Sequence, residues 1–249
     1  MGEYESAIDK LRSELAWEII NVVDDEDITN GLKPNWPSCR SIPEEKAHYI
    51  YIPKEDTEFE DSLLHELCHA TLSEKVHPFF GGPLVAVNEN CPLVTEVVVQ
   101  ISSAVADWYV ENMIANLCPN EVKKYFRKYI ICPDKVIQLL DWDEKLPPGR
   151  VLTDAYRLLL AFKYLDYEKQ VKLPERWEKV IKVFNNAPEK PSLKALRKIT
   201  NEFLALFFPP YQVKVIKVNG IDEFGTYKSS KLFFVEAICK GFDVSLRYY

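Results

Sequence analysis

The chain has no pair of cysteines at redox or metal-binding spacing, although it contains six cysteines in 249 residues. They are Cys39, Cys68, Cys91, Cys118, Cys132 and Cys239. Dispersed cysteines without a C-x-x-C motif are typical of reduced intracellular proteins. No apolar run approaches the roughly 18–20 residues that cross a bilayer, and the first five residues are acidic rather than apolar. We therefore expect a cytoplasmic protein with no signal peptide and no membrane partner.

Basic residues are also too few to form a nucleic-acid-binding face. The chain has 31 Lys and Arg against 38 Asp and Glu, a formal net charge of −7, and its pI is about 5.3. The sequence contains neither internal repeats nor low-complexity segments, which excludes repeat architectures. A hydrophobic content of 47% and a charged content of 28% describe an ordinary globular protein. Its oligomeric state stays open.

Histidine is scarce too, with four residues in all, and two of these lie in one short motif. Residues 65–69 read His65-Glu66-Leu67-Cys68-His69, an H-E-x-x-H sequence. Helix positions four apart lie on one face, so both imidazoles can bind one ion. Glu66 then lies beside the metal, where it can accept a proton from bound water without being a ligand. The motif predicts zinc ligands at His65 and His69 and a general base at Glu66.

The flanking sequence predicts that this motif is helical. Thr57 and Glu60 form a T-x-x-E capping box, which would start a helix eight residues before His65. The apolar positions that would bury the opposite face are Phe59, Leu63, Leu67 and Ala70. Residues 47–53 precede it and are β-branched or aromatic, so they predict a strand. We expect His48 within this strand to be structural, and Cys68 to be a small buried residue.

The rest of the sequence predicts an α+β protein that is mainly helical. This fold would have a core made of a strand and the H-E-x-x-H helix, followed by a helical region and a small C-terminal antiparallel β-meander. The expected domains are residues 1–118, 119–210 and 211–249, unless all three form one compact unit. The expected elements are an opening helix over 4–23, a turn-rich stretch to Pro43, an irregular segment over 73–92, a long helix over 93–117, helices to residue 208, and strands at 211–218, 231–239 and 242–248.

A catalytic zinc site needs a third protein ligand and an open position for water. The H-E-x-x-H-x-x-G-x-x-H pattern of metzincins is not met, because His77 falls two residues late and the intervening Gly is missing. The order of strand, H-E-x-x-H helix and later acidic helix, over residues 47–114, instead resembles the core of gluzincin metallopeptidases. That resemblance implies a zincin-like fold, peptidase activity and a carboxylate ligand on the second helix.

The Ala106-Asp107-Trp108-Tyr109 segment is similar to the A-N/D-x-F element of the ImmA/IrrE-like peptidases. In those families the ligand Glu lies one turn before the Asn or Asp, a position held here by Ser103. Glu96 and Gln100 resemble the clan's E-x-x-x-D pair, which makes Glu96 the preferred third ligand. Asp107, together with Glu111, is the alternative. The other open choices are His77, Glu89, Cys91 and no third ligand.

With a complete site, bound water would become acidic enough to ionise near neutral pH, and Glu66 would pass its proton to the leaving amine. The candidates for a second oxyanion donor are Tyr109, Tyr156 and His77. Strand 47–52 is expected to present a free edge along which a peptide substrate could lie. The preferred function is a zinc-dependent peptidase acting on a peptide or protein. The alternatives are an inactive metallopeptidase-like regulatory or partner-binding protein, suggested by Ser103, and hydrolysis of an amide in a small molecule.

Overall fold

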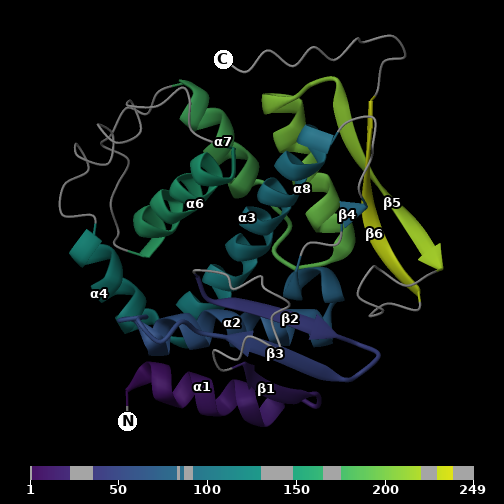
Figure 1. Ribbon diagram of the computed structural model, residues 1–249. Helices are drawn as coiled ribbons and strands as arrows, with labels where there is room; N and C mark the ends of the chain where they lie inside the picture. The colour runs from purple at the N-terminus through teal and green to yellow at the C-terminus, as the bar shows by residue number, and fades with distance from the viewer. Residues whose placement is uncertain are drawn as a thin grey trace.

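The computed structural model describes residues 2–22, 36–82, 85–86, 92–129, 148–164, 175–219 and 229–237. The helices in these ranges are α1 (Glu3–Glu14), α2 (Phe59–Lys75), the 3-10 helix η1 (Pro78–Gly81), α3 (Pro92–Leu117), α4 (Pro119–Tyr129), α6 (Pro148–Tyr164), α7 (Glu175–Asn185) and α8 (Leu193–Phe207). The strands are β1 (Glu18–Val22), β2 (Ser38–Ile42), β3 (Ala47–Tyr51), β4 (Val85–Ala86), β5 (Tyr211–Asn219) and β6 (Ser229–Ala237). The predicted α+β, mainly helical class is confirmed (Figure 1).

The strands form two small sheets at different ends of the molecule. In the first sheet, of order β1-β3-β2, β3 pairs parallel with β1 and antiparallel with β2. In the second, of order β4-β6-β5, β6 pairs parallel with β4 and antiparallel with β5. Helix α2 packs on the first sheet, and α3 rises through the centre of the molecule in contact with α2, α6 and α8 (Figure 1).

One hydrophobic cluster joins all parts of the described chain. Its largest fully buried aromatic side chains are Phe79, Phe80, Tyr156, Phe184, Phe203 and Phe233. They come from η1, α6, α7, α8 and β6, so each of the three predicted regions contributes to this cluster. The predicted boundaries near residues 118 and 210 stay predictions.

The predicted opening helix over residues 4–23 is wrong beyond Glu14, where α1 ends. The chain turns at Ala16 and Trp17, whose backbone N–H groups both donate to the Glu74 carboxylate. Residues 18–22 then form β1, which pairs in parallel with β3. The β-branched residues of this segment fit a strand as well as a helix. The pairing with β3 decides between them.

The expected free edge at strand 47–52 is also wrong. Strand β3 is the central strand of its sheet, since β2 and β1 cover its two sides. Strand β2 lies in the stretch that composition marks as turn-rich, and a turn at Pro43–Lys46 leads from it back into β3. A peptide substrate therefore cannot add to β3, and β1 and β2 are the edges of this sheet.

Helix α2 begins at Phe59, six residues before His65 rather than eight. The residue that supports its start is Asp56, not Thr57. Its carboxylate accepts the Glu58 N–H at 2.8 Å and the Ser62 hydroxyl at 2.7 Å. The helix forms as predicted, but the T-x-x-E capping box does not.

Helix α3 agrees with the predicted helix over residues 93–117 almost to the residue. An 18-residue window within Leu93–Leu117 has a mean hydropathy of 1.2, so this helix is long and apolar enough to cross a membrane, contrary to the expectation from the sequence. Helices that are apolar on all sides are found in membranes and in protein cores alike. Here 56% of that window is buried within the molecule, and α3 contacts α2, α6 and α8.

The C-terminal hairpin confirms two of the three predicted meander strands, as β5 and β6. The third, over residues 242–248, lies outside the described residues. The hairpin gains a strand that the sequence did not predict, because Val85 and Ala86 of β4 pair in parallel with Phe233 and Phe234. The segment after His69 is also more regular than expected, since α2 continues to Lys75 and η1 follows.

Candidate metal centre

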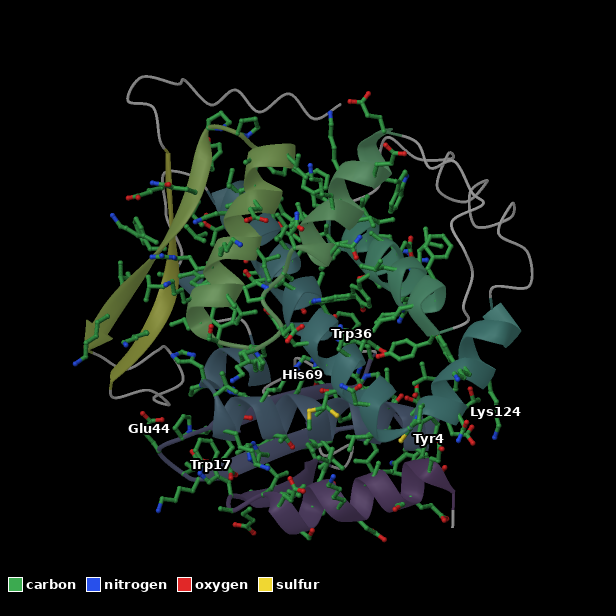
Figure 2. All side chains as sticks on the ribbon, turned by 180° about the vertical axis from the view of Figure 1, so that it is seen from behind. Tyr4, Trp17, Trp36, Glu44, His69 and Lys124 are labelled. Atoms are coloured by element: carbon green, nitrogen blue, oxygen red, sulfur yellow. The ribbon has the colours of Figure 1, made fainter. Side chains whose placement is uncertain are left out.

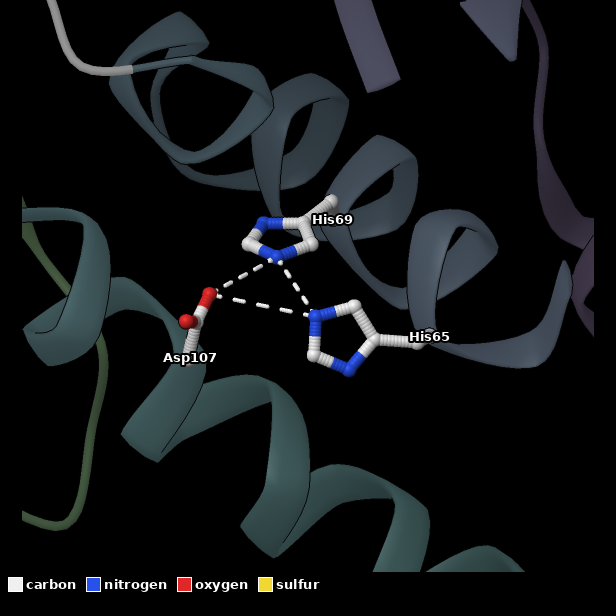
Figure 3. Close-up of side chains that lie close together, drawn as sticks. All are labelled: His65, His69 and Asp107. Carbon is white, nitrogen blue, oxygen red and sulfur yellow. Dashed lines mark hydrogen bonds and ion pairs between the residues drawn. The ribbon is translucent and has the colours of Figure 1, made fainter. Parts of the chain in front are cut away.

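Three polar side chains from two helices meet at one point (Figure 3). His65 and His69 extend from α2, and Asp107 faces them from α3. The Nε2 atom of His69 lies 3.1 Å from both His65 Nε2 and Asp107 Oδ1, and His65 Nε2 lies 3.8 Å from the same oxygen. Ligand atoms around a tetrahedral zinc ion, at about 2.0–2.1 Å from it, are about 3.3 Å apart. The three atoms already have the spacing that one ion needs.

The packing of α2 directs both imidazoles to this point. Leu64, Leu67 and Cys68 are fully buried on the other side of the helix. Burial of one leucine side chain contributes about 1.5–3 kcal/mol, so rotating α2 about its axis would be costly. The prediction that Cys68 is a small buried residue is thereby confirmed. Because His65 and His69 are one turn apart, the same rotation that buries the leucines presents both rings to α3.

Hydrogen bonds at the far nitrogens orient the two rings. His69 Nδ1 lies 2.6 Å from the carbonyl oxygen of Phe80, which can only accept, so His69 carries its proton on Nδ1. His65 Nδ1 lies 3.3 Å from the Glu111 carboxylate. Both Nε2 atoms are thus left with lone pairs that face each other and Asp107. Metal-binding histidines are usually held by such a carbonyl or carboxylate at the other nitrogen.

The two nitrogen lone pairs and the Asp107 carboxylate repel one another unless a positive charge lies between them. Burial by itself would lower the pKa of His65, but the hydrogen bonds to Asp107 and Glu111 raise it well above its ordinary value. Burial would raise the pKa of Asp107, and its bonds to His65 and His69 hold it far below its usual range instead. A divalent cation would supply the required charge without protonating either ring.

Glu66 lies at this centre but is not one of the three converging groups. It is only 5% exposed, and within the described part of the chain no side chain forms a hydrogen bond or ion pair with it. Burial raises the pKa of Glu66, and the nearby His65 and His69 partly oppose this. A carboxylate with a raised pKa is a better proton acceptor near neutral pH. Its side chain lines a cavity of about 280 Å³ next to His65.

The structure brings Asp107, and not Glu96, to the two histidines. Glu96 is exposed and lies eleven residues earlier on α3, or about 16 Å along the helix axis. Ser103 is one turn before Asp107, as expected, and takes no part in the group. His77 is engaged elsewhere, because its Nδ1 accepts the Phe79 N–H and caps η1. Glu89 and Cys91 lie outside the described residues.

Of the three predicted oxyanion donors, Tyr156 is the one on which the charges of Asp107 and Glu111 act. The hydroxyl of Tyr109 donates to the Pro188 carbonyl at 2.9 Å, away from the site. Tyr156 is 2% exposed, and burial together with the charges of Asp107 and Glu111 raises its pKa. The sequence did not predict Arg157, which lines the same cavity as His65 and Glu66. No spacing marks it, since it comes from α6, far along the chain.

His48, one of the two histidines outside the motif, is structural as predicted. It is completely buried, with Nδ1 2.8 Å from the Ser41 hydroxyl and Nε2 3.2 Å from Glu74. Its ring stacks on Trp17 at 5.1 Å between centroids. The network links β2, β3 and the end of α1 to α2, so it supports the helix that carries the metal centre.

No protein-family model, no curated protein and no solved structure matches the chain.

Proposed function

We propose that the protein is a zinc-dependent peptidase, in which His65, His69 and Asp107 hold the metal and Glu66 is the general base. The observation that carries this proposal is the convergence of two oriented Nε2 atoms and one carboxylate oxygen at tetrahedral spacing. Two imidazoles and one carboxylate, with a fourth position for water, are a frequent ligand set of catalytic zinc. A zincin-like core, with α2 packed on the β1-β3-β2 sheet and α3 supplying the third ligand, is part of the proposal.

A zinc ion in this site would supply a water of lowered pKa and would polarise the scissile carbonyl. Glu66 would take the proton of that water and pass it to the nitrogen of the leaving amine. Phe80 and Glu111 keep the proton of each ligand ring on Nδ1, so that Nε2 stays available. Tyr156 and Arg157 are the residues near the centre that could donate to the developing oxyanion.

Two other functions are weaker explanations of the same site. An inactive partner-binding protein was suggested because Ser103 stands where a ligand Glu was expected. Asp107 can be the third ligand instead, so Ser103 no longer argues against a complete metal site. Two histidines and a carboxylate also bind iron(II) in oxygenases. Glu66 is a buried carboxylate beside the three proposed ligands and is not one of them. Such a group favours hydrolysis, because it can accept a proton from the attacking water.

Metal analysis together with peptide cleavage tests the proposal. The protein, loaded with zinc and freed of excess, is expected to hold about one equivalent, because a site with three ligands at this spacing needs no rearrangement. Glu66→Gln should keep the zinc and lose about 10²–10⁴-fold in the rate of peptide cleavage. Glu178→Gln, on the exposed face of α7, is the matched control and should change neither. Less than about 0.2 equivalents of zinc, a preference for iron, or unchanged cleavage by Glu66→Gln would overturn the proposal.

A further inference from the structure

The cavity beside the metal centre continues into a second and larger one. The first, of about 280 Å³, includes His65, Glu66 and Glu111 in its wall. The second, of about 410 Å³, extends along the N-terminal half of α2 to α4. The two share the residues Tyr4, Glu58, Asp61 and Tyr125, so they form one groove that leads away from the metal centre. Figure 2 shows Tyr4 and Lys124 near the edge of the molecule, on α1 and α4, and His69 nearer to its centre.

The walls of this groove are strongly acidic. Its carboxylates are Glu58, Glu60, Asp61, Glu66, Glu111 and Glu121. Among the described residues that line it, Lys and Arg side chains come from Lys124, which forms an ion pair with Glu121, and from Arg157 at the metal end. Tyr4, Tyr125 and the half-exposed Phe59 add aromatic surface. A groove of this kind suits a long aliphatic side chain with a positive end.

A buried reactive group marks where a ligand in this groove would end. Glu66 is more than nine-tenths buried and opens onto the cavity. Among the described residues no side chain forms a hydrogen bond or ion pair with it. The acidic groove therefore leads to an unpartnered carboxylate beside the metal ligands, which is where a scissile bond would have to lie.

Helix geometry sets the distances from that bond to the acidic wall. Asp61 in the first turn of α2 and Glu58 just before the helix lie four and seven residues before His65 and line the same cavity, about 6 and 10 Å from it along the helix axis. An extended peptide advances about 3.3 Å per residue. Asp61 and Glu58 thus face the positions about two and three residues from the scissile bond.

We propose that this groove is the substrate-binding site and selects peptides with a lysine or arginine two to three residues from the scissile bond. The inference rests on the proposed peptidase function and deepens it. Asp61 and Glu58 bind the positive end of that side chain, and the ring of Tyr4 contacts its aliphatic part. The Tyr4 hydroxyl lies beside the Asp61 carboxylate and holds it on the groove wall.

Three peptides that differ only at this position, with Lys, Gln or Glu, test the selection. A hydrogen bond to a charged group is worth a factor of about 10–100, so kcat/KM should be at least about tenfold higher for the Lys peptide than for the Gln peptide. In the Glu58→Gln/Asp61→Asn variant this ratio should fall towards one, because both carboxylates that bind the positive charge are gone. Glu178→Gln serves as the control and should keep the full ratio.

Binding without turnover separates this inference from the peptidase proposal. Fluorescence anisotropy of the labelled peptides on zinc-loaded Glu66→Gln should give tighter binding in the order Lys, Gln, Glu. The single variant Glu58→Gln, an exposed position, guards against a fold defect at Asp61. Equal binding of the three peptides, or a preference that persists in the double variant, would overturn the inference. Ordered binding with no cleavage by the wild type would overturn the peptidase proposal alone.

Discussion

Asp107 and Glu96 are the two candidates for the third metal ligand. Replacing each of them in turn by alanine tests the structure most directly. Asp107 and Glu96 lie on the same helix, so Asp107→Ala and Glu96→Ala each remove one carboxylate from α3. The carboxylate of Asp107 contacts both histidines, and that of Glu96 is exposed about 16 Å away along the axis. Of these two carboxylates, only that of Asp107 should contribute to metal affinity.

The expected loss can be bounded from the contacts. Removing a group that merely orients a ligand costs about 10–100-fold in metal affinity. Asp107 Oδ1 lies 3.1 and 3.8 Å from the two Nε2 atoms, as a ligand of the same ion would. Removing Asp107 should therefore lower the metal affinity by more than about 100-fold, or about 2.8 kcal/mol. Its side chain is 22% exposed, and its removal should not open a large cavity in the core. Glu96→Ala should change the affinity less than about twofold, the ordinary range for an exposed residue.

Competition for zinc against a chromophoric chelator measures this difference, with circular dichroism to show that both variants fold. Asp107→Asn keeps the shape of the side chain and removes its charge, so it should resemble Asp107→Ala in affinity. If Glu96→Ala lost the metal, or if Asp107→Ala kept it, the reasoning from the structure would be refuted. The resemblance to the E-x-x-x-D pair would then be the better guide.

Three further predictions follow from contacts around the centre. Glu111→Gln weakens zinc binding about 10–100-fold by removing the carboxylate that orients His65, as the chelator competition will show. Burial lowers the pKa of His48 despite its bond to Glu74. The unfolded chain therefore binds one more proton than the folded protein below about pH 6.5, so stability falls as the pH falls. In urea titrations, His48→Gln should reduce the slope of the unfolding free energy against pH by up to about 1.4 kcal/mol per pH unit. Gly81→Ala destabilises by about 1–3 kcal/mol, read from thermal unfolding, because its Cβ would overlap two buried serine side chains.

Two of these predictions have a control in the same chain, and the third has a defined contrary outcome. Gly2→Ala places a methyl group where nothing lies within 4 Å, so it should leave the melting temperature unchanged. Glu178→Gln should leave zinc affinity unchanged, and a loss equal to that of Glu111→Gln would point to a general charge effect. An unchanged pH slope in His48→Gln would mean that His48 is protonated in the folded state and pairs with Glu74 as an ion pair.

Local sequence patterns predicted the long helices that no Pro or Gly interrupts. The long helix over residues 93–117 and the H-E-x-x-H helix are found as predicted, because apolar residues at helical spacing leave few alternatives. Residues 18–22 were predicted as helix and form β1, since β-branched residues fit either structure and only pairing with β3 decides. The sequence did not predict strand β2, because prolines and turns surround it. Its pairing with β3 holds it in the sheet.

By itself the sequence determined which helix carries the proposed zinc ligands and base, and that His65, Glu66 and His69 share one side of it. Helix periodicity is a local property, and a five-residue motif is enough to express it. Only the tertiary structure decided that Asp107 completes the group and that Glu111 and Phe80 orient the rings. Glu96 and Asp107 occupy the same face of α3, and the choice between them depends on where α3 crosses α2. That crossing is set by the packing of the whole core, to which residues from every part of the described chain contribute.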